Sequence, residues 1–179
     1  MSLTCRYMAS PVGQLKLVAK GNNLAAILWE NGRPNRVRLG PMSDDLNSEV
    51  LQRTEQQLSE YFAGTRTCFE LDLDFSGTDF QKKVWQALLT IPFGETRTYS
   101  QIALQIGSPA AVRAVGAANG KNPISIIAPC HRVIGMSGEL TGFAGGLAAK
   151  ELLLRLEGWD GNRLKNRVAV ENTVQGLLF

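Results

Sequence analysis

The sequence predicts an α+β protein in which an antiparallel sheet precedes a helical half. The N-terminal part has three short apolar runs separated by the turn signals PVG and GNN, at residues 3–10, 14–20 and 24–30. This is the pattern of a β-meander. After residue 77 the strand signals give way to helix-opening motifs. We therefore expect two domains, residues 1–76 and 77–160, and a C-terminal tail over residues 161–179.

Two further elements complete the predicted N-terminal domain, after a polar connection rich in proline and glycine. Residues 48–64 predict a helix that ends at Gly64 and has one apolar face. That face consists of Val50, Leu51, Thr54, Leu58, Tyr61 and Phe62. Residues 68–75 alternate strictly, which predicts a strand with its apolar side chains on one face. These are Phe69, Leu71, Leu73 and Phe75.

The C-terminal domain begins with three short helices. Thr78–Gln81 and Thr98–Gln101 each have the capping-box form, a threonine three residues before a glutamine. Each opens a helix, and Gly107 stops the second. Ser108 is expected to cap the third helix, with Pro109 at its first position.

Composition excludes several classes of protein. Hydrophobic residues make up 44% and charged residues 20%, as in globular proteins with a buried core, and no apolar run is long enough to cross a membrane. The segment MSLTCRYMAS has no apolar signal core, which predicts a cytoplasmic protein. The chain has three scattered cysteines and one histidine, so neither a disulfide framework nor a metal site is expected.

The net charge of +3 does not by itself indicate nucleic-acid binding, but the charged residues are unevenly distributed along the chain. No acidic residue occurs between Glu95 and Glu139, a window that contains four basic residues. Such a stretch suits a surface that approaches phosphates. A chance distribution in a loop-rich region explains it equally well.

Two short helices joined by GS have the form of a helix-turn-helix or of an ordinary helical hairpin. The second helix carries one long polar side chain, Arg113, among small residues such as Ala111, Ala114 and Gly116. Such a helix reads little sequence, but its backbone could come close to a duplex in the minor groove, with Arg113 inserted as a wedge. Alternatively, the small residues serve tight packing between helices.

The segment IIAPCHRVIG places Cys130 beside His131, the single histidine. A thiol must lose its proton to act as a nucleophile. In an extended chain neighbouring side chains point to opposite sides, so a base role for His131 needs a turn or a bridging water. It also needs a third group to orient the imidazole, for which Glu151 and Glu157 are candidates. A purely structural cysteine remains the alternative.

Residues 113–157 closely resemble the methylated-DNA–protein-cysteine methyltransferases, the O6-alkylguanine-DNA alkyltransferases. The resemblance is strong from Phe80 to Glu157 and weaker over SPVGQLKLVA and EYFAG. It implies a ribonuclease-H-like N-terminal domain and a winged-helix-like helix-turn-helix. It also implies a monomer that binds double-stranded DNA in the minor groove with little sequence preference. The implied reaction needs no cofactor and moves the alkyl group of a flipped-out O6-alkylguanine irreversibly to Cys130. Whether O4-alkylthymine is also a substrate stays open.

The resemblance also implies roles for individual residues. His131 takes the thiol proton through a water, Glu157 orients His131, and Asn122 braces the active-site turn. Tyr99 adjoins the rotated phosphate and protonates the departing guanine. Arg113 fills the gap in the base stack. Further DNA contacts are expected from Tyr99, Ser100, Gln81, Ser108, Ala111 and Arg132.

The implied alkyl pocket is lined by Val133, Phe143, Ala144 and Gly145. The carbonyls of Cys130 and Val133 would accept hydrogen bonds from the exocyclic amine of guanine. Phe143 departs from the family's usual tyrosine, and the missing hydroxyl bears on larger alkyl groups.

Two other function classes compete with this interpretation. A non-catalytic binder of DNA lesions would share the helix-turn-helix, but alkyltransferase-like proteins of that kind lack the cysteine. A thiol enzyme with turnover would have to release its product, and the chain has no oxyanion-hole signature such as GxSxG. A stable adduct of one methyl group would distinguish the alkyl acceptor from both.

Overall fold

The computed structural model describes residues 1–161. Its N-terminal half contains a four-stranded sheet in the order β3–β2–β1–β4. The strands are β1 (Leu3–Met8), β2 (Leu15–Lys20), β3 (Asn23–Trp29) and β4 (Met42–Asp44). The predicted antiparallel meander of β1, β2 and β3 is confirmed. β4 pairs in parallel with β1 and was not predicted, because a strand of three residues is too short to show alternation.

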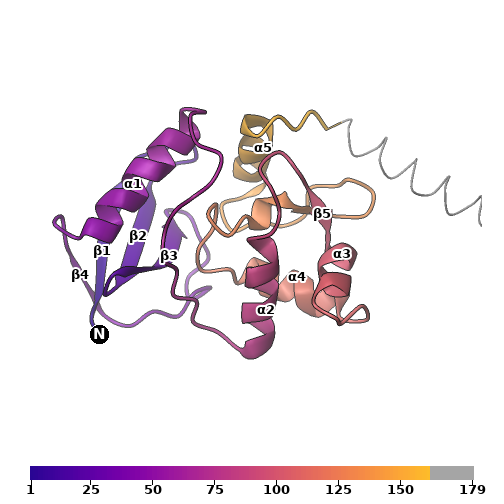
Figure 1. Ribbon diagram of the computed structural model, residues 1–179, viewed down its shortest axis with the longest axis horizontal. Helices are drawn as coiled ribbons and strands as arrows, with labels where there is room; N and C mark the ends of the chain where they lie inside the picture. Colours follow the sequence, from indigo (N-terminus) through magenta and orange to yellow (C-terminus); the bar gives the residue numbers. More distant parts are fainter. Residues whose placement is uncertain (162–179) are drawn as a thin grey trace, which may run out of the picture.

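Helix α1 (Glu49–Phe62) packs across one face of this sheet (Figure 1). Its predicted apolar face is confirmed for Val50, Leu51, Thr54, Leu58 and Tyr61, all of which are buried. After the helix, Gly64 adopts a φ of +78°, a left-handed conformation that glycine reaches without steric cost. The helix therefore ends where the sequence predicts.

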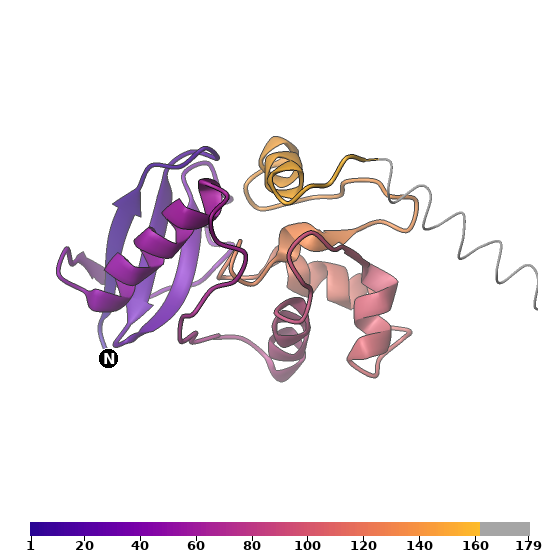
Figure 2. The same ribbon diagram turned by 45° about the horizontal axis from the view of Figure 1, so that its top comes forward.

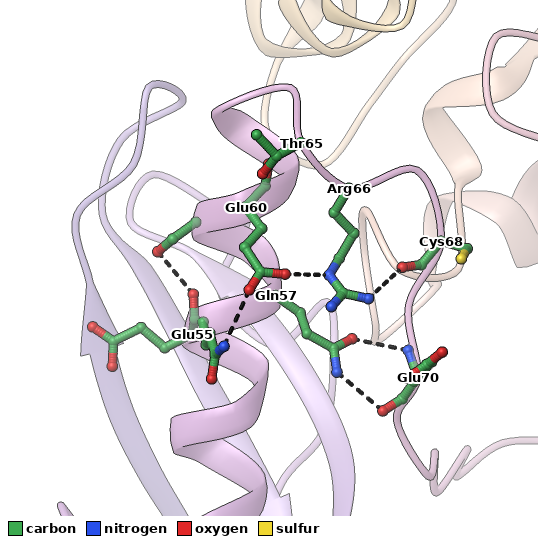
Figure 3. Close-up of polar contacts among 9 residues, drawn as sticks. Glu55, Gln57, Glu60, Thr65, Arg66, Cys68 and Glu70 are labelled. Atoms are coloured by element: carbon green, nitrogen blue, oxygen red, sulfur yellow. Dashed lines mark hydrogen bonds and ion pairs between the residues drawn. The ribbon is translucent and has the colours of Figure 1, made fainter.

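The prediction of a strand over residues 68–75 is wrong. The segment is extended, and it forms a single bridge between Leu73 and Leu24 of β3. At Glu70 its backbone instead bonds to the amide of Gln57 on α1, with Glu70 N donating to Oε1 at 2.8 Å and Nε2 donating to the Glu70 carbonyl at 3.1 Å (Figure 3). Arg66 adds a bond to the Cys68 carbonyl. The predicted apolar face still packs against the cores of the molecule.

The C-terminal half contains α2 (Asp79–Leu88), α3 (Tyr99–Gln105), α4 (Val112–Gly120) and α5 (Leu147–Leu156). Strands β5 (Arg97–Thr98) and β6 (Val133–Ile134) form a small parallel pair. Both predicted capping boxes are confirmed, since in each the threonine hydroxyl and the glutamine amide bond reciprocally. No helix in residues 1–161 is long and apolar enough to span a membrane.

Ser108 does not cap the third helix as predicted. Residues 108–111 form a turn closed by a bond from Ala111 N to the Ser108 carbonyl, and α4 starts only at Val112. Proline at the first helical position was compatible with either start, because the turn and the helix both leave its missing N–H unused.

The two halves lie side by side along the molecule and share part of their core (Figures 1 and 2). Strand β3 bonds to the segment that leads to the cysteine, through Ile27 N and the Pro123 carbonyl at 2.8 Å. Ile124, Ile126 and Ile127 are buried in the same cluster as the sheet and α1. The N-terminal sheet thus directly supports the segment that leads to Cys130. Of the predicted tail, all but Gly161 lies outside the described residues.

Candidate active site

Cys130 and His131 lie in a 3-10 turn, Cys130–Arg132, rather than in an extended segment. The turn removes the objection that neighbouring side chains must face opposite ways. Both residues are buried, with 2% of Cys130 and none of His131 exposed. Just upstream, Ile126 has a φ of +75°, a costly conformation for a β-branched residue, which full burial among its neighbours holds in place.

Glu157, at the end of α5, accepts hydrogen bonds from both halves of the protein. Its Oε1 lies 2.8 Å from His131 Nε2, and Arg132 donates to both oxygens at 2.8 and 2.9 Å. Tyr61 of α1 donates its hydroxyl at 2.7 Å. Burial alone would raise the pKa of Glu157, but the bonds from His131 and Arg132 outweigh it and lower that pKa to about 2. The carboxylate is therefore ionised at neutral pH. The other candidate, Glu151, pairs with Arg155 on the exposed face of α5.

In this arrangement one ring nitrogen of His131 is held by the carboxylate and the other can accept a proton. Bonding of Nε2–H to the carboxylate assigns the proton to Nε2 and leaves Nδ1 as the free acceptor. Nδ1 has no protein hydrogen-bond partner among residues 1–161. Burial lowers the pKa of His131, although Glu157 acts in the opposite direction, so the ring is neutral at neutral pH.

The environment of the Cys130 thiol acts on its pKa in two opposite directions. Burial raises its pKa, while hydrogen bonds from Asn122 and Ser125 and the charges of Lys150 and Arg36 act in the opposite direction. The resting group is a thiol, so a base has to remove its proton before it can attack. His131, the next residue in the chain, is the candidate for that base, since its Nδ1 has no partner among residues 1–161.

Asn122 braces the loop before the cysteine. It is fully buried, its Nδ2 donates to the Ala128 carbonyl at 2.7 Å, and its Oδ1 accepts from Ile124 N at 3.0 Å. Arg36 of the N-terminal half donates to the Asn122 carbonyl at 2.8 Å and to the Gly120 carbonyl at 3.2 Å. Sequence reasoning missed Arg36, since it lies in an irregular polar connection with no periodic pattern.

Tyr99 and Lys150 hold the loop that follows β6. The Tyr99 hydroxyl lies 2.6 Å from Thr141 Oγ1, and burial raises the pKa of Tyr99, so it is protonated at neutral pH. Lys150 Nζ donates to the carbonyls of Val133 at 2.6 Å and Thr141 at 3.2 Å. Burial lowers the pKa of Lys150 to about 8. Sequence reasoning missed this lysine, although its position on the apolar face of α5 was a usable signal.

Two of the residues predicted to line the alkyl pocket, Val133 and Phe143, pack with Cys130 in one hydrophobic cluster. Phe143 packs against the cluster that contains Cys130, and its ring lies edge-on to His131 at a centroid distance of 6.4 Å. Val133 is buried, and Ala144 and Gly145 are half-buried beside Phe143. Residues 143–145, called the pocket wall below, come from the loop that leads into α5.

The predicted DNA-binding residues are more dispersed. Arg113 is exposed on α4, and Ala114 and Ala117 of the same helix are exposed as well. Of the small residues on this helix, Ala114 and Ala117 thus face outward, whereas Ala118 is buried in the helical core and Gly116 is half-buried beside Tyr99. Gln81, Tyr99, Ser100, Ser108 and Ala111 are half-buried. Arg132 is placed differently from the expectation: its guanidinium is buried against Glu157 and the Ile91 carbonyl, so it belongs to the carboxylate network.

Comparisons with known proteins agree over nearly the whole described chain. Sequence models described as the DNA binding domain and the ribonuclease-like domain of 6-O-methylguanine DNA methyltransferase match residues 79–159 and 3–75. A Mycobacterium tuberculosis strain H37Rv protein named methylated-DNA–protein-cysteine methyltransferase is 51% identical over 154 residues, 85% of this chain and 90% of that protein. The chain belongs to the 6-O-methylguanine DNA methyltransferase family.

Two further members of the 6-O-methylguanine DNA methyltransferase family are similar to this chain at a comparable identity and coverage. A Methanosarcina acetivorans protein with the same name is 49% identical, covering 83% of this chain and 94% of that protein. The crystal structure of Mycobacterium tuberculosis OGT in complex with DNA superposes with a TM-score of 0.80 at 49% identity, covering 86% of this chain and 92% of that one. The resemblance and the α+β fold predicted from the sequence are thus confirmed.

Proposed function

We propose that this protein repairs DNA by moving the alkyl group of O6-alkylguanine to its own Cys130, once per molecule. Family membership supports the reaction class, and the similar Mycobacterium protein was solved in complex with DNA. The observation that carries the proposal is the buried Cys130–His131 turn, in which Glu157 binds Nε2 of His131 at 2.8 Å while Nδ1 has no partner in residues 1–161. This constellation has the groups needed to activate the Cys130 thiol.

The chemistry balances without a cofactor. His131 Nδ1 takes the thiol proton, directly or through a water, and Glu157 stabilises the resulting imidazolium. The thiolate forms a bond to the alkyl carbon while the bond from that carbon to O6 breaks, and the electron pair passes to guanine. Tyr99, protonated at neutral pH, can supply the proton that guanine then needs. The product is a thioether, which does not revert.

The buried thiol also bears on how DNA is bound. Since only 2% of Cys130 is exposed, a stacked base cannot reach it and the nucleotide has to leave the duplex. The exposed small residues of α4 fit a close approach to the minor groove, with Arg113 filling the vacated base step. Double-stranded DNA as the substrate, this minor-groove approach, a monomeric state and a cytoplasmic location are all parts of the proposal.

The intact mass of the protein tests the proposed function. After incubation with a duplex that carries O6-methylguanine, we expect a stable gain of one methyl group per molecule, mapped to Cys130. A lesion binder would bind the duplex with unchanged mass, and a thiol enzyme with turnover would return to its starting mass. Either result would overturn the proposal.

Replacing Arg113 by alanine is expected to slow repair of O6-methylguanine in duplex DNA by about tenfold or more, because an unfilled base step costs a few kcal/mol. Reaction with free O6-benzylguanine needs no flipping and should change by less than about twofold. Single-turnover rates of the variant and the parent with both substrates provide the comparison.

Lys121→Ala is the matched control for this variant. Lys121 is the exposed basic residue directly after α4, so its loss removes one charge without removing the wedge. We expect it to weaken DNA binding slightly and leave the rate of the bound complex unchanged. Equal loss of rate with duplex and free base in Arg113→Ala would mean that Arg113 supports the fold rather than flipping.

A further inference from the structure

Trp29, the last residue of β3, contacts two sides of the candidate site from the N-terminal half. Its indole Nε1 donates to Ser125 Oγ at 3.2 Å, in the buried segment that leads to Cys130. Its ring also lies edge-on to Phe143 of the pocket wall, with centroids 5.3 Å apart. Trp29 is 8% exposed and is part of the core shared by the two halves.

The same ring leaves no room for a side chain at Gly145. A Cβ added there would lie 2.6 Å from two atoms of the Trp29 ring and 2.9 Å from a third. Gly145 does not have the left-handed φ that favours glycine, so contact with Trp29 is the reason a larger residue does not fit. The pocket wall therefore rests directly on the indole.

Trp29 thus contacts two separate parts of the chain at the candidate site. One is the buried segment that leads to Cys130, reached at Ser125, and the other is the pocket wall, reached at Phe143 and Gly145. An aromatic ring held by a hydrogen bond at its N–H and by packing against a neighbouring loop cannot shift without disturbing both contacts. The pocket wall thus cannot move toward Trp29 unless the ring is displaced.

We propose that Trp29 is a positioning residue that holds the pocket wall near Cys130 and so limits the size of the alkyl group transferred. This inference rests on the proposed function, because it assumes that residues 143–145 face the transferred group. It assigns a specificity-determining role to a residue outside the helical half that carries the thiol. Small alkyl groups are then favoured over bulky ones for a reason built into the N-terminal sheet.

The first test compares two lesions in the same duplex, O6-methylguanine and O6-benzylguanine. Trp29→Leu should raise the ratio of the benzyl rate to the methyl rate by about tenfold, the range expected when a pocket gains room for a few carbon atoms. Both lesions require flipping, so the ratio cancels changes in DNA binding. A ratio equal to that of the parent would show that Trp29 serves the core alone and would overturn the inference.

Trp29→Phe keeps the test decisive if Trp29→Leu folds poorly. It retains an aromatic ring in the core but removes the indole N–H and the outer part of the ring system. We expect the rate ratio to rise in this variant too, by a smaller factor. Circular dichroism and thermal unfolding identify the variants whose rates can be compared.

The second test uses Gly145→Ala, whose added methyl collides with Trp29. In the parent background this substitution should lower the unfolding temperature and the methyl-transfer rate. In the Trp29→Leu background, where the clash is relieved, both should recover. Gly142→Ala is the matched control, since a Cβ at Gly142 in the same loop meets no atom of the described part of the chain within 4 Å. An equal penalty for Gly145→Ala in both backgrounds would show that Trp29 does not hold the wall.

The experiments distinguish an error in the proposed function from an error in the role of Trp29. If the parent protein forms no adduct with either lesion, the proposed function is wrong. If the parent forms the adduct but the rate ratio and the Gly145→Ala penalty do not depend on residue 29, only the role of Trp29 is wrong.

Discussion

Cys130→Ser is expected to abolish alkyl transfer while leaving DNA binding nearly intact. A hydroxyl is a far weaker nucleophile than a thiolate, so we expect the rate to fall by more than about 10³-fold. The affinity for duplex DNA should stay within about twofold of the parent, because groove and phosphate contacts come from other residues. Intact mass and a binding titration on the same preparation measure the two properties.

The other cysteines provide the control for this prediction. Cys68→Ser should react like the parent, since Cys68 is exposed and lies on the extended segment beside α1. Cys5 is buried and its thiol donates to Asp44, and burial raises its pKa, so it is a poor nucleophile. A methyl group mapped to Cys5 or Cys68 in the parent protein would contradict the assignment of Cys130.

Glu157→Gln should slow alkyl transfer by about tenfold to a hundredfold, within the range that general-base catalysis contributes. Without the carboxylate, the protonated form of His131 loses its stabilising anion, so the pKa of His131 falls further and the ring becomes a weaker base. The acidic limb of the pH–rate profile should therefore move to lower pH. Glu151→Gln, on the exposed face of the same helix, should leave rate and profile unchanged.

A profile identical to that of the parent in Glu157→Gln would exclude the relay through His131.

The same variant should also differ from the parent in its stability toward acid. The folded pKa of Glu157, about 2, is below its ordinary value of 4.5, so its contribution to stability is complete above pH 4.5 and is lost as the pH falls toward 2. That contribution is on the order of 3 kcal/mol for a group buried this deeply. Glu157→Gln also leaves Arg132 buried without its anion, which destabilises the fold at neutral pH.

Urea unfolding at both ends of this pH window measures the effect. The free energy of unfolding should differ most between parent and Glu157→Gln above pH 4.5, and the difference should shrink near pH 2. A difference that does not change with pH would mean that the carboxylate is not ionised in the folded protein.

Features set by neighbours along the chain could be predicted from the sequence. The capping boxes at Thr78 and Thr98 need only a partner three residues away, and both form as expected. The apolar face of α1 follows from helical periodicity. Local rules failed at residues 68–75 and at Ser108. In the first case the side chain of Gln57 takes the backbone bonds of Glu70. In the second case two local structures fitted the same residues equally well.

The sequence by itself determined that Cys130 and His131 are adjacent, that the fold is α+β, and which family the chain resembles. The residues alone left Glu151 and Glu157 open as partners of His131, and the resemblance pointed to Glu157, which the tertiary structure places against His131. Only the tertiary structure decided that Arg132 lies buried beside Glu157. It also decided that Tyr61, Arg36 and Trp29 reach the site from the N-terminal half. The physical reason is that these contacts join residues 86 to 96 positions apart, and no periodic pattern records which distant side chains the packing of two halves brings together.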